Sequence, residues 1–209
     1  MDIKLLNQNF ELHPTGAMYW KEEDALLIAD VHIGKVQHFR KSGIAVPVRK
    51  KLENFEKLDL LIKNYSPAKV YFLGDLFHSD KNIEWDYFFE WLKQNEQEFH
   101  LIIGNHDKTG LRSLPVSKLI LHDELIIGDF LLTHEPTTRE NFVNFCGHIH
   151  PGILLRGKGK SGMKIPCFAQ QKNQLVLPAF GAFTGLYILT KKEYNHLYLT
   201  ADEEVFQLK

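Results

Sequence analysis

The chain has 209 residues, of which 44% are hydrophobic and 24% charged, with a formal net charge of -1 and a pI of about 6.8. This size suits a single domain over residues 1–209, and the near-neutral charge excludes the strongly basic nucleic-acid binders, whose pI is usually above about 9, although it permits a local basic surface. Two cysteines make no disulfide framework, and no stretch reaches the about 18 consecutive apolar residues of a membrane span, so we expect a cytoplasmic protein with reduced thiols and no membrane contact.

The first half of the chain alternates between strand-like and helical patterns. Apolar runs at 25–32, 69–78 and 99–107 predict strands, and apolar residues at helical spacing predict helices over 48–64 and 83–96. This order is typical of an α/β unit. The first helix places Leu52, Phe55, Leu58 and Ile62 at helical spacing, and the second places Ile83, Tyr87, Phe88, Trp91 and Leu92 on one face. We expect Trp85, Phe88, Phe89 and Trp91 to lie in the core.

The second half of the chain contains shorter apolar runs separated by Gly, Pro and Asn. The stretches 124–136, 141–150 and 172–200 predict short strands, which we expect to pair as antiparallel hairpins. Within them, the small apolar residues of 177–185 are expected to let two sheets pack closely. No repeat, linker or low-complexity segment interrupts the chain.

Five of the apolar runs end in polar side chains. In chain order these ends read Asp30-x-His32, Gly74-Asp75-x-x-His78, Gly104-Asn105-His106-Asp107, His134, and Gly147-His148-x-His150. Loops that follow the carboxyl ends of strands in an α/β sheet gather at one edge, where ligands bind. The five ends are therefore expected to meet at one point, and the glycines would allow sharp turns or close approach there.

The residue types at these ends are those of a metal site. Imidazole nitrogens and carboxylate oxygens bind Mn, Fe and Zn, and no cysteine takes part. Members two apart in the sequence would point to the same side of an extended backbone. The candidate ligands exceed the four that one structural zinc needs, which suits two metals if the central Asp75 bridges them. They are Asp30, His32, Asp75, Asn105, His134, His148 and His150.

Each of these residues also has an ordinary structural interpretation. Asp30 could cap a helix or turn, and Asn105 or Asp107 could cap a short helix. His134 beside Glu135 could be a turn residue, and the last two histidines could be solvated strand residues. These interpretations do not explain why all five clusters follow strands, so the metal site is favoured.

Together the motifs between residues 30 and 150 resemble those of the calcineurin-like metallophosphoesterase superfamily. The resemblance implies an α/β (α+β) fold, a four-layer α/β/β/α sandwich of two mixed β-sheets flanked by helices. It also implies that Asp30, His32 and His150 bind one divalent metal, that Asn105, His134 and His148 bind a second, and that Asp75 bridges them. Two such cations would hold a hydroxide that attacks the phosphorus in line.

A narrower resemblance extends over nearly the whole chain. The stretches LLIADVHIGKVQHFRKSGIAVP, GHIHPGILLRGKGKSGMKIPCF and LVLPAFGAFTGL are similar to the bacterial ligase-associated DNA-damage-response endonucleases. That subfamily implies a phosphodiesterase or nuclease acting on DNA, single-stranded or damaged, during repair. It further implies an ATP-dependent DNA ligase and a helicase as partners. We expect Mn²⁺ as the metal, with Zn²⁺, Fe or Ni²⁺ as alternatives.

Three further side chains are assigned roles around the metals. By the same resemblance, His106 would protonate or stabilise the leaving oxygen, held by Asp107 or Asp75. His78 is either a residue that orients Asp75 or an ordinary loop residue, and the sequence favours neither.

Two basic segments flank the proposed site in sequence. One follows the first metal motif and the other follows the last, and such clusters favour polyanions and give salt-sensitive contacts to nucleic acid. A solvated face and a hairpin tip are the ordinary alternatives. The candidate substrate contacts are Lys35, Arg40, Lys41, Arg139, Arg156, Lys158 and Lys160.

Two other functions compete with DNA cleavage. The near-neutral pI permits a hydrolase of small phosphate esters or cyclic nucleotides. A metal-bound repair scaffold without catalysis is a second alternative, although every ligand position and His106 are filled.

Overall fold

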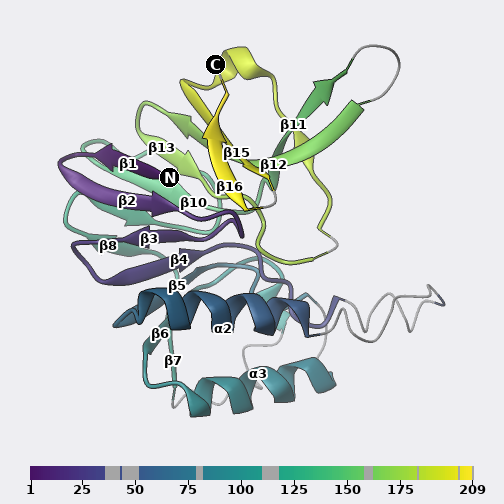
Figure 1. The fold of residues 1–209 in the computed structure, drawn as a ribbon. Coiled ribbons are helices and arrows are strands. Elements are labelled where there is room, and N and C mark those ends of the chain that lie inside the picture. Colours follow the sequence, from purple (N-terminus) through teal and green to yellow (C-terminus); the bar gives the residue numbers. More distant parts are fainter. Residues whose placement is uncertain are drawn as a thin grey trace.

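Two mixed β-sheets pack face to face in the computed structural model (Figure 1). The structure describes residues 1–35, 43, 52–78, 82–109, 118–157, 162–182, 184–201 and 203–208. The first sheet contains, in spatial order, β1 (Asp2–Leu5), β2 (Gln8–Leu12), β3 (Met18–Trp20), β4 (Ala25–Ile28), β5 (Lys69–Leu73), β6 (Glu98–Ile102) and β7 (Leu119–His122). The second contains β14 (Tyr187–Ile188), β11 (Pro151–Arg156), β12 (Gly162–Gln171), β13 (Gln174–Val176), β10 (Val143–Cys146), β9 (Phe130–Leu132) and β8 (Leu125–Ile127), with β15 (His196–Ala201) beside β12 and β16 (Glu204–Gln207) beside β15.

The first sheet changes from antiparallel to parallel at β4. Strands β1 to β4 pair antiparallel, and β4 to β7 pair in parallel. The parallel half is the α/β unit that the sequence predicted. The N-terminal strands β1 to β3 were not predicted, because their apolar residues are few and scattered. The sandwich of two mixed sheets is confirmed.

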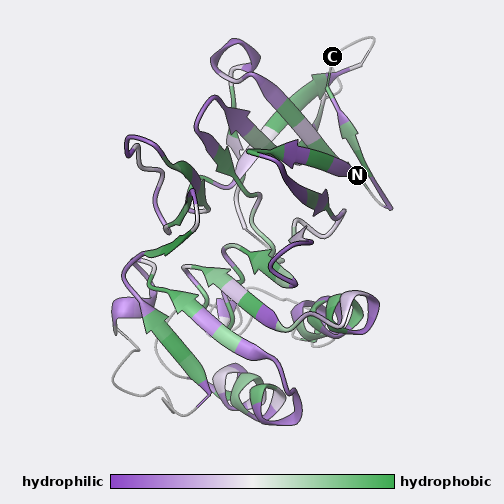
Figure 2. Ribbon diagram, turned by 90° about the vertical axis from the view of Figure 1, so that its left-hand side faces the viewer, coloured by the Kyte–Doolittle hydropathy of each residue, from purple (hydrophilic) through white to green (hydrophobic). Residues whose placement is uncertain are grey.

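Helices α2 (Glu53–Tyr65) and α3 (Ile83–Gln94) lie on the outer face of the first sheet (Figure 1). Both helices alternate hydrophobic and hydrophilic residues along their length (Figure 2). Side chains that alternate along β4 separate two cores: Leu26 and Ile28 face the helices, whereas Leu27 faces the second sheet. The described helices are too short or too polar to cross a membrane.

Both predicted helices exist, but their buried faces differ from the prediction. In α3 the expected burial of Trp85 and Phe89 is confirmed, whereas the side chains of Ile83 and Tyr87 are 49% and 46% exposed and lie off the buried face. Trp85, Phe88, Phe89 and Leu92 follow the i, i+3, i+4, i+7 spacing of one helical stripe. In α2, Leu52 precedes the helix and is exposed, and the fully buried residues are Leu58 and Leu61. The predicted start at 48 lies outside the described residues.

Replacing Trp85 with alanine should destabilise the protein strongly. The indole is 1% exposed and stacks on Phe77, with ring centroids 3.9 Å apart. We expect a loss of about 3–5 kcal/mol in the free energy of unfolding, because the truncation leaves a cavity. Urea unfolding of Trp85→Ala beside Tyr87→Ala, which truncates an exposed ring of the same helix, checks this. Equal costs for the two variants would contradict the packing described.

The second sheet is mixed and not purely antiparallel. Strand β10 pairs in parallel with both β9 and β13, while β8 and β9 form the expected antiparallel hairpin. The expectation of antiparallel hairpins was therefore wrong for β10 and also for β14, which pairs in parallel with β11. The pairs of β10 with β13 and of β11 with β14 join strands that are not neighbours in the chain, which local sequence patterns do not specify. Both cysteines, Cys146 and Cys167, are free and buried in this sheet.

Candidate metal centre

The five polar strand ends meet at one edge of the sandwich. The loops after β4 and β5 are joined by backbone hydrogen bonds, from Asp30 N–H to the Gly74 carbonyl at 3.2 Å and from His32 N–H to the Asp75 carbonyl at 3.0 Å. The loop after β10 is tied to the loop after β9, because Gly147 N–H donates to the His134 carbonyl at 3.0 Å. The second sheet therefore brings its histidines to the edge where the first sheet carries its carboxylates.

Asp30, His32 and His150 form the first ligand cluster. The Nε2 atoms of His32 and His150 lie 3.2 Å apart, and His150 Nε2 lies 3.3 Å from Asp30 Oδ1. The other oxygen of Asp30 accepts a 2.8 Å hydrogen bond from His148 N–H. One carboxylate thus faces the cluster and also fixes the loop that carries the last two histidines.

Asp75, His134 and His148 form the second cluster. His134 Nε2 lies 3.4 Å from Asp75 Oδ1, 2.9 Å from Asn105 Oδ1 and 3.0 Å from His148 Nδ1. The second oxygen of Asp75 lies 4.0 Å from His32 Nε2, in the first cluster. Asp75 therefore lies between the two groups with one oxygen toward each.

Five of these residues have a left-handed backbone. Their φ angles are 54° at Asp30, 51° at His32, 47° at Asp75, 68° at His148 and 53° at His150. Such conformations cost about 1–3 kcal/mol each and are typical of functional sites. The prediction that residues two apart share one side of an extended strand was therefore wrong. The strands end two or more residues earlier, and the turns aim these side chains inward.

Two glycines permit the close packing of the loops. Gly74 has a φ of 79°, and a Cβ there would overlap the imidazole of His134. A Cβ at Gly147 would overlap the carboxylate of Asp30. A side chain at either position would displace a candidate ligand, which is why the apolar runs end in glycine.

The protonation states suit a cation. Burial, together with the positive charge of Lys35, lowers the pKa of His32 to about 2, so this imidazole is neutral. His134 Nδ1 lies 3.0 Å from the Leu73 carbonyl, a contact that leaves Nε2 to face the cluster. Asp30 Oδ1 is buried and accepts no hydrogen bond within the described chain. A divalent cation would satisfy this oxygen and the converging nitrogens together.

His106 and His78 lie at the entrance to the clusters. The imidazole of His106 is 43% exposed, and its Nε2 lies 3.9 Å from Asp75 Oδ2. The ring of His78 lies 5.3 Å from the ring centroids of both His32 and His106 and is stacked on the latter. The structure thus places His78 against two imidazoles of the site.

Asp107 has a positioning role and does not face the cleft. It is fully buried, and its carboxylate accepts backbone N–H groups of Phe77 at 3.0 Å and Gly104 at 2.9 Å. Burial raises its pKa to about 6, against the lowering effect of these two donors. It joins the loops after β5 and β6, and its role in orienting His106 stays a prediction.

The comparisons with known proteins decide the family. A model of the calcineurin-like phosphoesterase family matches residues 25–175. The chain belongs to this family. The crystal structure of Pseudomonas putida nuclease MPE is similar over 100% of this chain and 99% of that chain, with 29% identity and a TM-score of 0.84. Yfce, a phosphoesterase from E. coli, is 12% identical over 88% of this chain and 97% of that chain, with a TM-score of 0.48. No curated protein sequence matches the chain.

Calcineurin-like phosphoesterases use divalent metals, and the two clusters supply the donors for them. The chain is a metal-dependent phosphoesterase. Which metal it uses is part of the proposal below.

The basic residues predicted to contact the substrate lie in different environments. Lys35 is half-buried beside the site, and the charges of Asp30 and Asp75 act on it. Arg139 instead forms a two-pronged ion pair with Glu124, at 2.8 and 2.7 Å, so its guanidinium is already neutralised. Arg156 is exposed at the end of β11. Arg40, Lys41, Lys158 and Lys160 lie outside the described residues.

The sequence reasoning missed Asn54, which positions the first motif from α2. Its Nδ2 donates to the Val31 carbonyl at 3.0 Å, and its Oδ1 accepts from Ala182 N–H at 3.2 Å. The segment 177–185 therefore packs against the first metal loop and not merely between the sheets. No sequence signal identifies Asn54, because an asparagine on a helix has no characteristic partner.

The change Asn54→Ala should loosen the first metal loop. We expect a loss of about 1–3 kcal/mol in the free energy of unfolding, because a carbonyl and an amide lose their partners. We also expect Mn²⁺ binding roughly tenfold weaker, as for lost outer partners of metal ligands. Calorimetric titration with Mn²⁺ measures the affinity, and Asn64→Ala, which changes an exposed residue of the same helix, is the control for a general effect on the helix. Equal Mn²⁺ affinities in the two variants would show that Asn54 does not support the metal loop.

Proposed function

We propose that this phosphoesterase is a two-metal phosphodiesterase that cuts DNA. The observation that carries the proposal is the position of Asp75, with one oxygen 3.4 Å from His134 and the other 4.0 Å from His32. A carboxylate between two ligand clusters is the arrangement that a metal pair requires.

The donors divide between two cations. Asp30, His32 and His150 would hold one, Asn105, His134 and His148 would hold the other, and Asp75 would contact both. When bound, such a pair supplies Lewis acidity toward phosphate oxygens and a nucleophile derived from water. Mn²⁺ is our proposal, and Zn²⁺, Fe or Ni²⁺ would suit the same nitrogen and oxygen donors.

The chain's own residues supply proton transfer and charge. The imidazole of His106 is partly exposed, with Nε2 3.9 Å from Asp75 Oδ2, where it can give a proton to the leaving oxygen. Asp75 Oδ1 accepts the backbone N–H of His106 at 2.9 Å and so fixes this histidine relative to the metal ligands. Lys35 adds a positive charge beside the site, which favours an anionic substrate.

The choice of DNA is supported by two observations. The similarity to a nuclease covers the full chain at 29% identity, and basic segments follow the first and last metal motifs in sequence. A role in DNA repair, with an ATP-dependent ligase and a helicase as partners, follows from the subfamily resemblance and belongs to the proposal.

Hydrolysis by metal-stripped protein tests the proposal. A labelled single-stranded oligonucleotide, bis(p-nitrophenyl) phosphate and cyclic nucleotides would each be offered with added Mn²⁺, Zn²⁺, Ni²⁺ or Fe²⁺. We expect cleavage of the oligonucleotide that depends on Mn²⁺ and ceases with a chelator. Cleavage of only the small esters would assign the site to a small-ester hydrolase, and no turnover of any diester would favour a scaffold.

A further inference from the structure

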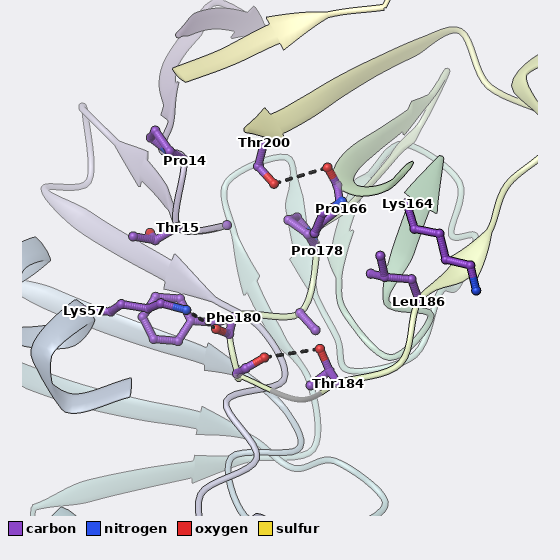
Figure 3. A pocket seen from close by; sticks show the side chains of 13 residues that line it. Pro14, Thr15, Lys57, Lys164, Pro166, Pro178, Phe180, Thr184, Leu186 and Thr200 are labelled. Atoms are coloured by element: carbon purple, nitrogen blue, oxygen red, sulfur yellow. Dashed lines mark hydrogen bonds between the residues drawn. The ribbon is translucent and has the colours of Figure 1, made fainter. Parts of the chain in front are cut away.

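A pocket of about 460 Å³ lies between segments of both sheets and α2 (Figure 3). Its walls come from the turn 14–16 before β3, from α2, from β12 and β15, and from the loop that joins β13 to β14. This volume is within the range of sites that take a small molecule or one unit of a polymer. None of the metal ligands lines it.

The pocket and the metal centre share one wall. Phe180 N–H donates to the Ala29 carbonyl at 2.9 Å, and Gly181 N–H donates to the Asp30 carbonyl at 3.0 Å. A Cβ at Gly181 would overlap the Val31 carbonyl, so the two backbones touch without a side chain between them. The pocket therefore lies directly behind the backbone of the first metal loop.

The charges that line the pocket are positive. Lys57 and Lys164 lie on opposite sides of it, with Pro178, Phe180 and Thr184 between them (Figure 3). Lys57 Nζ lies 5.5 Å from the centroid of the Phe180 ring and donates to the Phe180 carbonyl at 3.4 Å, which holds it at the wall. It also lies 3.8 Å from Glu53 Oε1, one helical turn earlier, so its charge is partly offset. The described residues that line the pocket include no carboxylate.

A second pocket, of about 290 Å³, differs in charge. It contains the candidate ligands Asn105 and His134 and is bordered by three carboxylates and one lysine, Lys108. The carboxylates are Asp123, Glu135 and Glu124, of which Glu124 is paired with Arg139, so that Asp123 and Glu135 carry the excess negative charge. Like charges repel a polyanion from this side of the centre. Of the two pockets, the one with Lys57 and Lys164 is therefore the better path for a nucleic-acid strand.

We propose that the 460 Å³ pocket binds one nucleotide of a single-stranded nucleic-acid substrate, next to the bond that is cut. Lys57 and Lys164 neutralise the phosphates, and the partly exposed rings of Pro14 and Pro166, with Leu186, offer apolar surface to a base. This assignment rests on the proposed nuclease function. The residues of the pocket would give the enzyme its preference for a polymer over a small ester.

The test compares three lysine variants of the Mn²⁺-loaded enzyme. Lys164→Gln and Lys57→Gln remove the pocket charges, and Lys172→Gln removes an exposed charge just beyond the opposite end of β12. The readout is kcat/KM for a labelled single-stranded oligonucleotide as a function of salt. One lost phosphate contact reduces the log–log salt slope by about 0.7 and lowers kcat/KM about fivefold at 0.1 M salt. We expect this in each pocket variant, through KM, and not in Lys172→Gln.

The outcomes separate this assignment from the proposed function. If the wild type cleaves the oligonucleotide and all three variants share its salt slope, the pocket assignment is overturned and the nuclease function stands. If the wild type cleaves bis(p-nitrophenyl) phosphate but not the oligonucleotide, the nucleic-acid substrate is overturned and the pocket assignment with it. Thermal unfolding of each variant shows that a changed slope does not arise from misfolding.

Discussion

Asp75→Ala should remove both metals and abolish hydrolysis. The two oxygens of Asp75 face different ligand clusters, so its loss takes the only carboxylate from the second cluster and leaves the first with Asp30 alone. A metal pair stabilises transition-state charge by several kcal/mol, and each about 1.4 kcal/mol corresponds to tenfold in rate. We therefore expect activity to fall by at least about 10³-fold. Metal analysis of the purified variant, beside turnover of bis(p-nitrophenyl) phosphate, provides the measurement.

Two companion variants make the result specific. Asp75→Asn keeps the shape and an oxygen for the His106 N–H group, which donates at 2.9 Å in the structure, so it separates loss of charge from loss of folding. Asp129→Ala removes an exposed carboxylate away from the clusters and should keep full metal content. Full occupancy of both sites in Asp75→Ala would show that this carboxylate does not bridge.

His106→Ala should keep the metals and lose most of the turnover. Its imidazole is 43% exposed at the cleft entrance and belongs to neither ligand cluster. Losing a general acid typically costs 10²–10⁴-fold in rate, and removal of a half-exposed side chain has little effect on folding. The same metal analysis and oligonucleotide cleavage measure both parts of this expectation.

The leaving group gives an independent check on His106. Nitrophenolate leaves without a proton, whereas a nucleotide oxygen needs one, so the rate loss should be smaller for bis(p-nitrophenyl) phosphate than for the oligonucleotide. His196→Ala, an exposed histidine on β15, should leave both rates unchanged. An equal loss on the two substrates would mean that His106 positions the phosphate and is not the acid.

Much of the fold and of the site could be predicted from local sequence. An apolar run that ends in glycine and then in Asp, Asn or His identifies both the strand and its functional end, because burial and turn formation act on neighbouring residues. The α/β unit from β4 to β6 was predicted for this reason. The exposure of the Ile83 and Tyr87 side chains was not predicted, because the rotation of a helix about its axis depends on the sheet that it covers.

The sequence by itself determined which side chains gather at the site, from Asp30 to His150, because each lies beside a local strand signal. Only the tertiary structure decided what they do there. The resemblance had implied the two ligand sets, but the structure alone shows that Asp107 accepts two backbone N–H groups and that Arg139 pairs with Glu124. These assignments depend on contacts such as that between Asp30 and His148, which are 118 positions apart in the chain. Local patterns carry no record of such contacts, because packing of the two sheets alone brings these segments together.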